Sequence, residues 1–186
     1  MIKKTLGYIL IIISIIVIYA YHSDDIRRST EESKKINQYL VSNQTYDKQD
    51  EAILAILEIP KIKLKKPLYN IDSKLNNVNK NIEVLHESTM PNHENGSLIL
   101  ASHSGNSKIS YFKNLNKLSI NDELIIYYNK EKYIYKITNI YKANKTGSIE
   151  LIRNPNKRVL SLITCDKSDR TKQVVYISEL DYIESI

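Results

Sequence analysis

The chain has 186 residues, of which 42% are hydrophobic and 26% charged, a length and balance that suit one globular domain and exclude a disordered or collagen-like chain. The net charge of +6 is spread along the sequence without a dense basic stripe, so no nucleic-acid partner is expected. The chain contains one cysteine, Cys165, which excludes an intramolecular disulfide framework and a multi-cysteine zinc site.

The first predicted element is a membrane-spanning helix at residues 5–23. This segment carries no Lys, Arg, Asp or Glu, and about 20 residues at a rise of 1.5 Å each cross the hydrocarbon core of a bilayer. A cleaved signal peptide is the alternative, but residues 19–22 (Tyr-Ala-Tyr-His) lack the pair of small residues that cleavage requires, which favours an uncleaved anchor. Lys3 and Lys4 precede the span, so residues 1–4 are expected to be a cytoplasmic tip and the remainder extracellular.

The rest of the chain divides at Asp50. Residues 24–50 are polar and lack Gly and Pro, which predicts a solvated helix or stalk. Residues 51–186 form the predicted domain, where short apolar runs separated by turn residues are typical of strands. The main predicted strands are 52–59, 98–101, 123–128, 132–141, 158–164 and 173–180. Short strands with few helices indicate a mostly β closed barrel or sandwich.

Three local patterns add detail to this domain. Strict alternation in 132–141 places Tyr133, Tyr135, Ile137 and Tyr141 on one face of the strand. Residues 129–131 are predicted to make a hairpin connection. Segments 75–85 and 109–118 are predicted to be helical and to cover ends of the sheet.

A cysteine and a histidine each stand at the exit of a predicted strand. Cys165 comes after 158–164, where the strand can fix its backbone while the side chain meets a substrate; the alternative is a small buried residue. A cysteine nucleophile needs an imidazole or another cation nearby. His103 follows the strand 98–101, whereas the other three histidines are assigned to the membrane exit, the structural interior or the polar surface (His22, His86, His93). Cys165 and His103 are therefore the candidate dyad.

Three segments in the expected order resemble the sortase family. Residues 161–165 (Ser-Leu-Ile-Thr-Cys) resemble its Thr-Leu-x-Thr-Cys signature, and 98–103 resembles the strand that leads to its catalytic histidine. Residues 57–62 (Leu-Glu-Ile-Pro-Lys-Ile) resemble the strand that opens the sortase barrel. The similarity covers residues 51–186 and is closest to class A-like members. It implies an eight-stranded sortase-type β-barrel with short helices.

The resemblance also implies a reaction and a set of residues. Cys165 would attack the Thr-Gly carbonyl of an LPxTG-like sorting signal, and an amine of the cell wall or of a pilin subunit would resolve the thioester. His103 would protonate the leaving amine. An arginine would hold the substrate and the oxyanion, and the expected residue is Arg170, with Lys172 or Gln173 as alternatives for that position.

Other readings remain open from the sequence. In a membrane-tethered cysteine hydrolase, water would resolve the thioester, and an inactive module with the same barrel would bind peptides without reaction. No cofactor is expected, although four acidic residues leave a calcium site open (Asp72, Glu83, Glu87, Glu94). Asn121 and Asp122 stand where the family often has a Gly-Asp turn, and asparagine tolerates the left-handed conformation such a turn needs.

Overall fold

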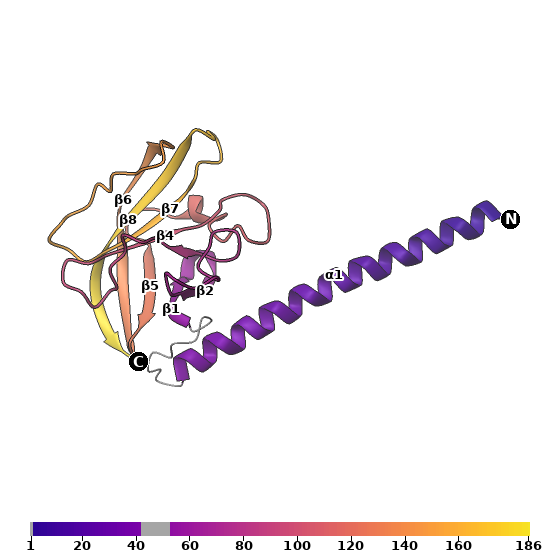
Figure 1. Ribbon diagram of the computed structural model, residues 1–186, viewed down its shortest axis with the longest axis horizontal. Coiled ribbons are helices and arrows are strands. Elements are labelled where there is room, and N and C mark those ends of the chain that lie inside the picture. The colour runs from indigo at the N-terminus through magenta and orange to yellow at the C-terminus, as the bar shows by residue number, and fades with distance from the viewer. Residues whose placement is uncertain (1, 42–52) are drawn as a thin grey trace. The chain divides into compact units, whose positions relative to one another are not determined.

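A computed structural model describes residues 2–41 and 53–186 of the chain (Figure 1). It contains two compact units, residues 1–38 and 39–186. The first is made of helix α1 (Ile2–Val41) as far as Gln38. The second contains every strand found in the described residues and forms the sheet domain.

Helix α1 runs without interruption through the predicted span at 5–23 and on into the predicted stalk as far as Val41. From Gly7 onward it contains an 18-residue window with a mean hydropathy of 1.7 and no buried residue. The apolar part of α1 is exposed on all sides, and the helix is long enough and apolar enough to cross a membrane. Residues 42–50 of the predicted stalk lie outside the described residues.

Eight strands form one sheet in the order β2-β1-β5-β6-β8-β7-β4-β3. All neighbours are antiparallel except β4 and β7, which run parallel. The edge strands β2 and β3 contact each other, so the sheet curls into a nearly closed barrel. The strands are β1 (Ile53–Ile59), β2 (Leu64–Tyr69), β3 (Glu83–Val84), β4 (Ser97–Ala101), β5 (Glu123–Tyr128), β6 (Glu131–Asn144), β7 (Val159–Cys165) and β8 (Lys172–Ser185). The predicted mostly β barrel is confirmed.

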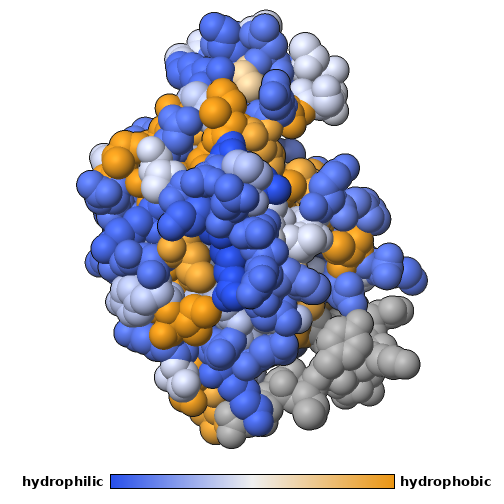
Figure 2. Space-filling view, turned by 90° about the vertical axis from the view of Figure 1, so that its left-hand side faces the viewer, coloured by the Kyte–Doolittle hydropathy of each residue, from blue (hydrophilic) through white to orange (hydrophobic). Residues whose placement is uncertain are grey.

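Strands β4 and β7 and residues 175–178 of β8 are buried on both faces. Leu100 and Leu162 point into the barrel interior, where they are fully buried. On the outer face, Ile99, Ile163 and Val175 belong to a second apolar cluster. Burial on both sides explains why β7 is a continuous apolar run rather than an alternating one. The face shown in Figure 2 is mostly hydrophilic, with apolar patches interspersed.

A bulge in β6 breaks the alternation predicted for this strand. Tyr133, Tyr135 and Ile137 share one face as predicted, and that face is the interior, but the pairing with β8 shifts at the next residue. The extra residue, Thr138, exchanges the two faces for everything that follows it. Tyr141 therefore packs against the outer cluster, and its predicted position on the face of Tyr133 is wrong.

Segment 75–85 is not helical, contrary to the prediction, because asparagine side chains replace the backbone hydrogen bonds of a helix. The Asn76 side chain donates to the Val84 carbonyl (2.9 Å) and accepts from the Val84 amide (2.7 Å). The Asn81 side chain donates to the Leu75 carbonyl at 3.0 Å. The segment is a series of turns that ends in β3.

Segment 109–118 also differs from its predicted helix. It consists of turns followed by a short 3-10 helix, η2 (Leu115–Lys117); a second one, η1 (Pro60–Ile62), follows β1. The apolar side chains Phe112 and Leu115 are buried in the barrel core, so the apolar spacing reports burial rather than helix.

Two predicted turns are confirmed. The hairpin between β5 and β6 turns at Asn129 (φ 50°) and Lys130 (φ 66°), both in the left-handed region, which matches the twist of the flanking strands. Asn121, before β5, has φ 71° and supplies the left-handed residue predicted for that turn.

Candidate active site

The parallel pairing of β4 with β7 places His103 and Cys165 next to each other in register. Ala101 of β4 pairs with Ile163 of β7. His103 and Cys165 each follow these partners by two residues, so they reach the same level on the same outer face. Neighbouring strands are about 4.8 Å apart. The ends of these two strands therefore bring an imidazole and a thiol to one site.

Hydrogen bonds between the two strand ends fix their backbones. The Thr164 hydroxyl donates to the Ser102 carbonyl (2.8 Å), and the Ser104 hydroxyl donates to the Cys165 carbonyl (2.6 Å). The carbonyl of His103 accepts from the Phe112 amide at 3.1 Å. Because Phe112 is anchored in the core, the loop after β4 is held in place on both sides of the histidine.

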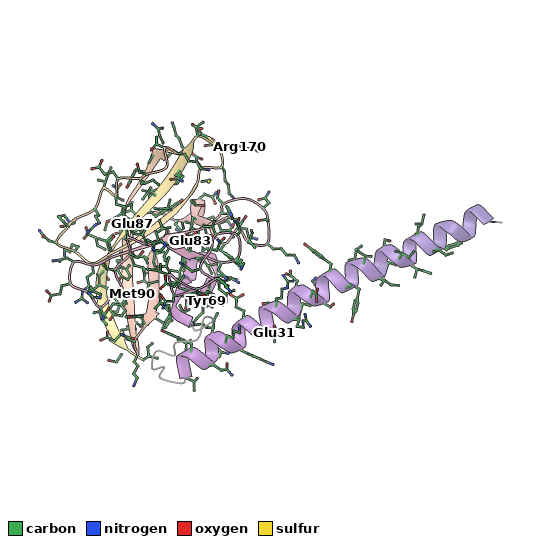
Figure 3. All side chains as sticks on the ribbon, viewed as in Figure 1. Glu31, Tyr69, Glu83, Glu87, Met90 and Arg170 are labelled. Atoms are coloured by element: carbon green, nitrogen blue, oxygen red, sulfur yellow. The ribbon has the colours of Figure 1, made fainter. Side chains whose placement is uncertain are left out.

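Cys165, His103 and Arg170 all line one cavity of about 730 Å³ at this end of the barrel. Cys165 and His103 are half-buried, whereas Arg170 is exposed in the turn between β7 and β8 (Figure 3). The structure thus brings the three predicted site residues around one space. The cavity is also lined by polar residues of the loop after β4 and by two lysines (Ser104, Gly105, Asn106, Ser107, Ser110, Lys145, Lys167).

The two alternatives to Arg170 lie on opposite faces of β8. Gln173 pairs directly with Cys165, so both side chains are on the outer face. Lys172 precedes it and points to the other face, where its amine lies 3.7 Å from the Asp169 carboxylate. Strand β8 begins at Lys172, and Arg170 therefore reaches the cavity from the turn rather than from a strand.

Asn79 contacts the candidate histidine and was not found from the sequence. Its side-chain oxygen lies 3.3 Å from Nε2 of His103. Asn79 belongs to the turn series that replaces the predicted helix at 75–85. A hydrogen bond of this kind orients the ring and selects which nitrogen carries the proton.

Asp166 organises the turn that follows the cysteine. Its carboxylate lies 2.5 Å from the Lys142 amine and accepts hydrogen bonds from the amide (2.9 Å) and hydroxyl (2.8 Å) of Ser168. The bond from Lys142, followed by those from Ser168, holds the pKa of Asp166 well below its usual range. The charged carboxylate therefore fixes the short connection that carries Arg170.

A second cavity, of about 800 Å³, lies on the outer face of β4 and β7. Its floor is apolar and includes Ile99, Ala101 and Ile163, and residues 147–151 line one side. Tyr141 holds that segment, since its hydroxyl donates to the Glu150 carbonyl (2.9 Å) and accepts from the Ile152 amide (3.0 Å). An apolar groove beside a thiol is suited to an extended peptide.

The four acidic residues considered for a calcium site do not form a metal-binding cluster in the described part of the chain. There, no group of three or more His, Cys, Asp or Glu side chains is close enough to hold a metal ion. Glu83 and Glu87 line the second cavity, away from Arg170 (Figure 3). The Glu83 carboxylate accepts a hydrogen bond from the Val78 amide (3.2 Å).

Comparison with known proteins identifies the domain. The family model described as the sortase domain matches residues 57–181. No curated protein matches the sequence.

Among solved structures, sortase A of Listeria monocytogenes is 20% identical with a TM-score of 0.62, covering 73% of this chain and 92% of that one. A sortase D5 transpeptidase of Clostridium perfringens is 21% identical (TM-score 0.63; 81% and 98%). Sortase E1 of Streptomyces coelicolor, solved with a tripeptide in the active site, is 20% identical (TM-score 0.59; 72% and 90%). The similar structures span several sortase classes rather than class A alone. With a barrel that presents one cysteine beside a histidine, the chain belongs to the sortase family of cysteine transpeptidases.

Proposed function

We propose that this sortase cleaves an LPxTG-like sorting signal between Thr and Gly and transfers the new carboxyl end to an amine of the cell wall or of a pilin subunit. The observation that carries the proposal is the register of β4 and β7, which brings Cys165 and His103 to one cavity, two residues beyond Ala101 and Ile163 of the apolar groove. This arrangement supplies a nucleophile, a proton carrier and a peptide-binding surface in one place.

The reaction follows from the positions of these side chains. The Cys165 thiolate attacks the Thr carbonyl carbon, forming a C–S bond and moving the π electrons to oxygen. When the tetrahedral intermediate collapses, the C–N bond breaks and His103 gives a proton to the departing Gly amine. The incoming amine then attacks the thioester, loses its proton to His103 and releases the thiolate. Arg170, exposed at the mouth of the cavity, holds substrate carbonyl oxygens by charge-assisted hydrogen bonds.

The second cavity is the proposed site for the residues that precede the scissile bond. Its apolar floor matches the Leu-Pro part of the signal, and Ile163 of that floor precedes Cys165 by two residues on the same face. A peptide lying on Ile163 would thus lead its next residues toward the sulfur. The tripeptide seen in the active site of the Streptomyces coelicolor enzyme supports peptide binding by this fold.

The test is a product assay on the purified chain with LPxTG-type peptides. Wild type should form a hydroxylamine-sensitive thioester and, when a glycine or lysine amine is added, an amide product. Cys165→Ala and His103→Ala should each abolish product, and the double variant should be scarcely worse than either, because the two residues act as a unit. Arg170→Ala should lower peptide turnover, with Lys172→Ala as the matched control because Lys172 lies on the other face. Hydrolysis unaffected by added amine would instead favour a cysteine hydrolase, and no reaction by an intact fold would favour a binding module.

We further propose that α1 anchors the enzyme in the cell membrane with its amino terminus in the cytoplasm and the sheet domain outside. The exposed apolar window of α1 supports the anchor, and Lys3 and Lys4 before it support the orientation. A surface protein and a cell-wall amine would both be accessible on that side.

A further inference from the structure

The Cys165 sulfur has a cationic neighbour that is not one of the three predicted site residues. The amine of Lys145 lies 3.8 Å from Sγ. Lys145 directly follows β6, where its amide donates to the Thr171 carbonyl at 2.8 Å. Its side chain lines both the cavity around Cys165 and the apolar groove, so it stands where the two spaces meet.

The bulge in β6 explains why this lysine reaches the thiol. Beyond Thr138, Ala143 pairs with Gln173 of β8, and Gln173 pairs with Cys165 of β7. These three side chains form one row on the outer face. Lys145 follows Ala143 by two residues and so shares that face, and its long side chain extends across β8 to the sulfur.

Other lysines near the site have different partners. Their amines contact the Asp166 carboxylate, the Lys113 carbonyl and the Asp169 carboxylate, respectively (Lys142 at 2.5 Å, Lys167 at 2.6 Å, Lys172 at 3.7 Å). The position opposite Cys165 on β8 holds Gln173, which is uncharged. Among the described residues, Lys145 is the cation with an amine in contact with the Cys165 sulfur.

We propose that Lys145 is a catalytic residue that stabilises the Cys165 thiolate and then the oxyanion of the tetrahedral intermediate. The ammonium group first donates a hydrogen bond to S⁻. When the C–S bond forms, the negative charge moves to an oxygen two bonds from the sulfur, within reach of the same flexible side chain. Lys145 keeps its proton throughout, while His103 carries the proton that the leaving amine takes. The second role rests on the proposed acyl transfer, whereas the first does not.

The first experiment measures thiolate reactivity without any peptide. Alkylation of Cys165 by iodoacetamide is followed from pH 6 to 10 in the full-length chain in detergent. Lys145→Met should slow alkylation at pH 7 by about tenfold, the lower end of the effect of a nearby charge because Lys145 is exposed. The rate should return to that of wild type at pH 10, which a damaged fold would not show. Lys145→Arg should keep the fast reaction because it keeps the charge.

Lys167→Met is the matched control, since it removes the same charge from the same cavity but from an amine bonded to the Lys113 carbonyl. If both variants slowed alkylation at pH 7 equally, the effect would come from the net charge of the cavity, and the proposal would be overturned. The proposal would also be overturned if Cys165 in the Lys145→Met variant were alkylated at pH 7 as fast as in wild type.

The second experiment measures acylation by an LPxTG-type peptide in a single turnover. Lys145→Met should lower the maximal acylation rate by about 10²- to 10³-fold. The peptide concentration that gives half of the maximal rate should stay nearly unchanged, because the contact acts on the developing charge. An amide on Lys145 that survives hydroxylamine would show a neutral, nucleophilic amine and contradict the role. If wild type is not acylated by any peptide, the proposed function fails, while the alkylation series still decides whether Lys145 stabilises the thiolate.

Discussion

His103 owes its position to backbone register and its orientation to a neighbour. The position could be anticipated, because His103 and Cys165 each stand at the end of an apolar run. Its contact with Asn79 could not, since Asn79 is one of several asparagines in a polar segment and only the folded turns show which of them meets the ring. Side chains supplied by irregular segments carry no periodic signal in the sequence.

Removing the Asn79 contact should slow catalysis without weakening substrate binding. Asn79→Ala frees the imidazole to rotate away from the leaving group, and misplacement of a catalytic group commonly costs about 10- to 100-fold in rate. Asn79→Asp keeps an oxygen at this position and should recover most of the loss. Steady-state kinetics on one peptide should show the change in kcat rather than in KM. Equal losses in both variants, together with a lower melting temperature, would instead assign Asn79 a structural role in the turns.

At the level of elements, strands were predicted better than helices for a physical reason. Burial leaves a period-two pattern or an apolar run, and the sequence shows the first in 132–137 and the second in 123–128 and 158–164. The apolar spacing in 109–118 also reported burial, but without hydrogen bonds that make a helix. The bulge at Thr138 has no signature in the sequence. Strict alternation continued through β6 would place Lys145 on the interior face, away from Cys165. The contact between Lys145 and Cys165 therefore could not be predicted.

The turn between β7 and β8 should stabilise the fold in a pH-dependent way. The pKa of Asp166 is lowered by its bonds with Lys142 and Ser168, so the folded chain binds fewer protons than the unfolded chain. This contribution is complete well above the ordinary aspartate pKa of about 3.9 and is lost as the pH falls through and below that value. Asp166→Asn should therefore melt below wild type at pH 7, and the gap should narrow below about pH 4.

Thermal unfolding of both proteins between pH 2.5 and pH 7 measures this gap. Asp181→Asn is the matched control, because its ion pair with Lys136 is more exposed and such pairs contribute little. A gap of constant size over the whole pH range would show that the carboxylate charge does not stabilise the turn.

For the whole molecule, one continuous helix combines an apolar part with a charged part. The uncharged segment at 5–23 fits the bilayer core, and the helix continues as a polar one to Val41. A lysine pair directly precedes the apolar part, whereas Asp24 and Asp25 separate it from the first basic residues that follow, Arg27 and Arg28. This asymmetry predicts a cytoplasmic amino terminus.

The single cysteine makes the predicted orientation directly measurable. In intact protoplasts, a membrane-impermeant maleimide should label Cys165, because the half-buried thiol lines a cavity that the proposed orientation places outside. Two variants in a Cys165→Ala background separate topology from thiol reactivity. Lys157→Cys, at an exposed position of the sheet domain, should be labelled in intact protoplasts, whereas Ile2→Cys should be labelled only after permeabilisation. Labelling of Ile2→Cys alone in intact protoplasts would reverse the orientation, and a sheet domain recovered in the soluble fraction without the helix would show cleavage in place of anchoring.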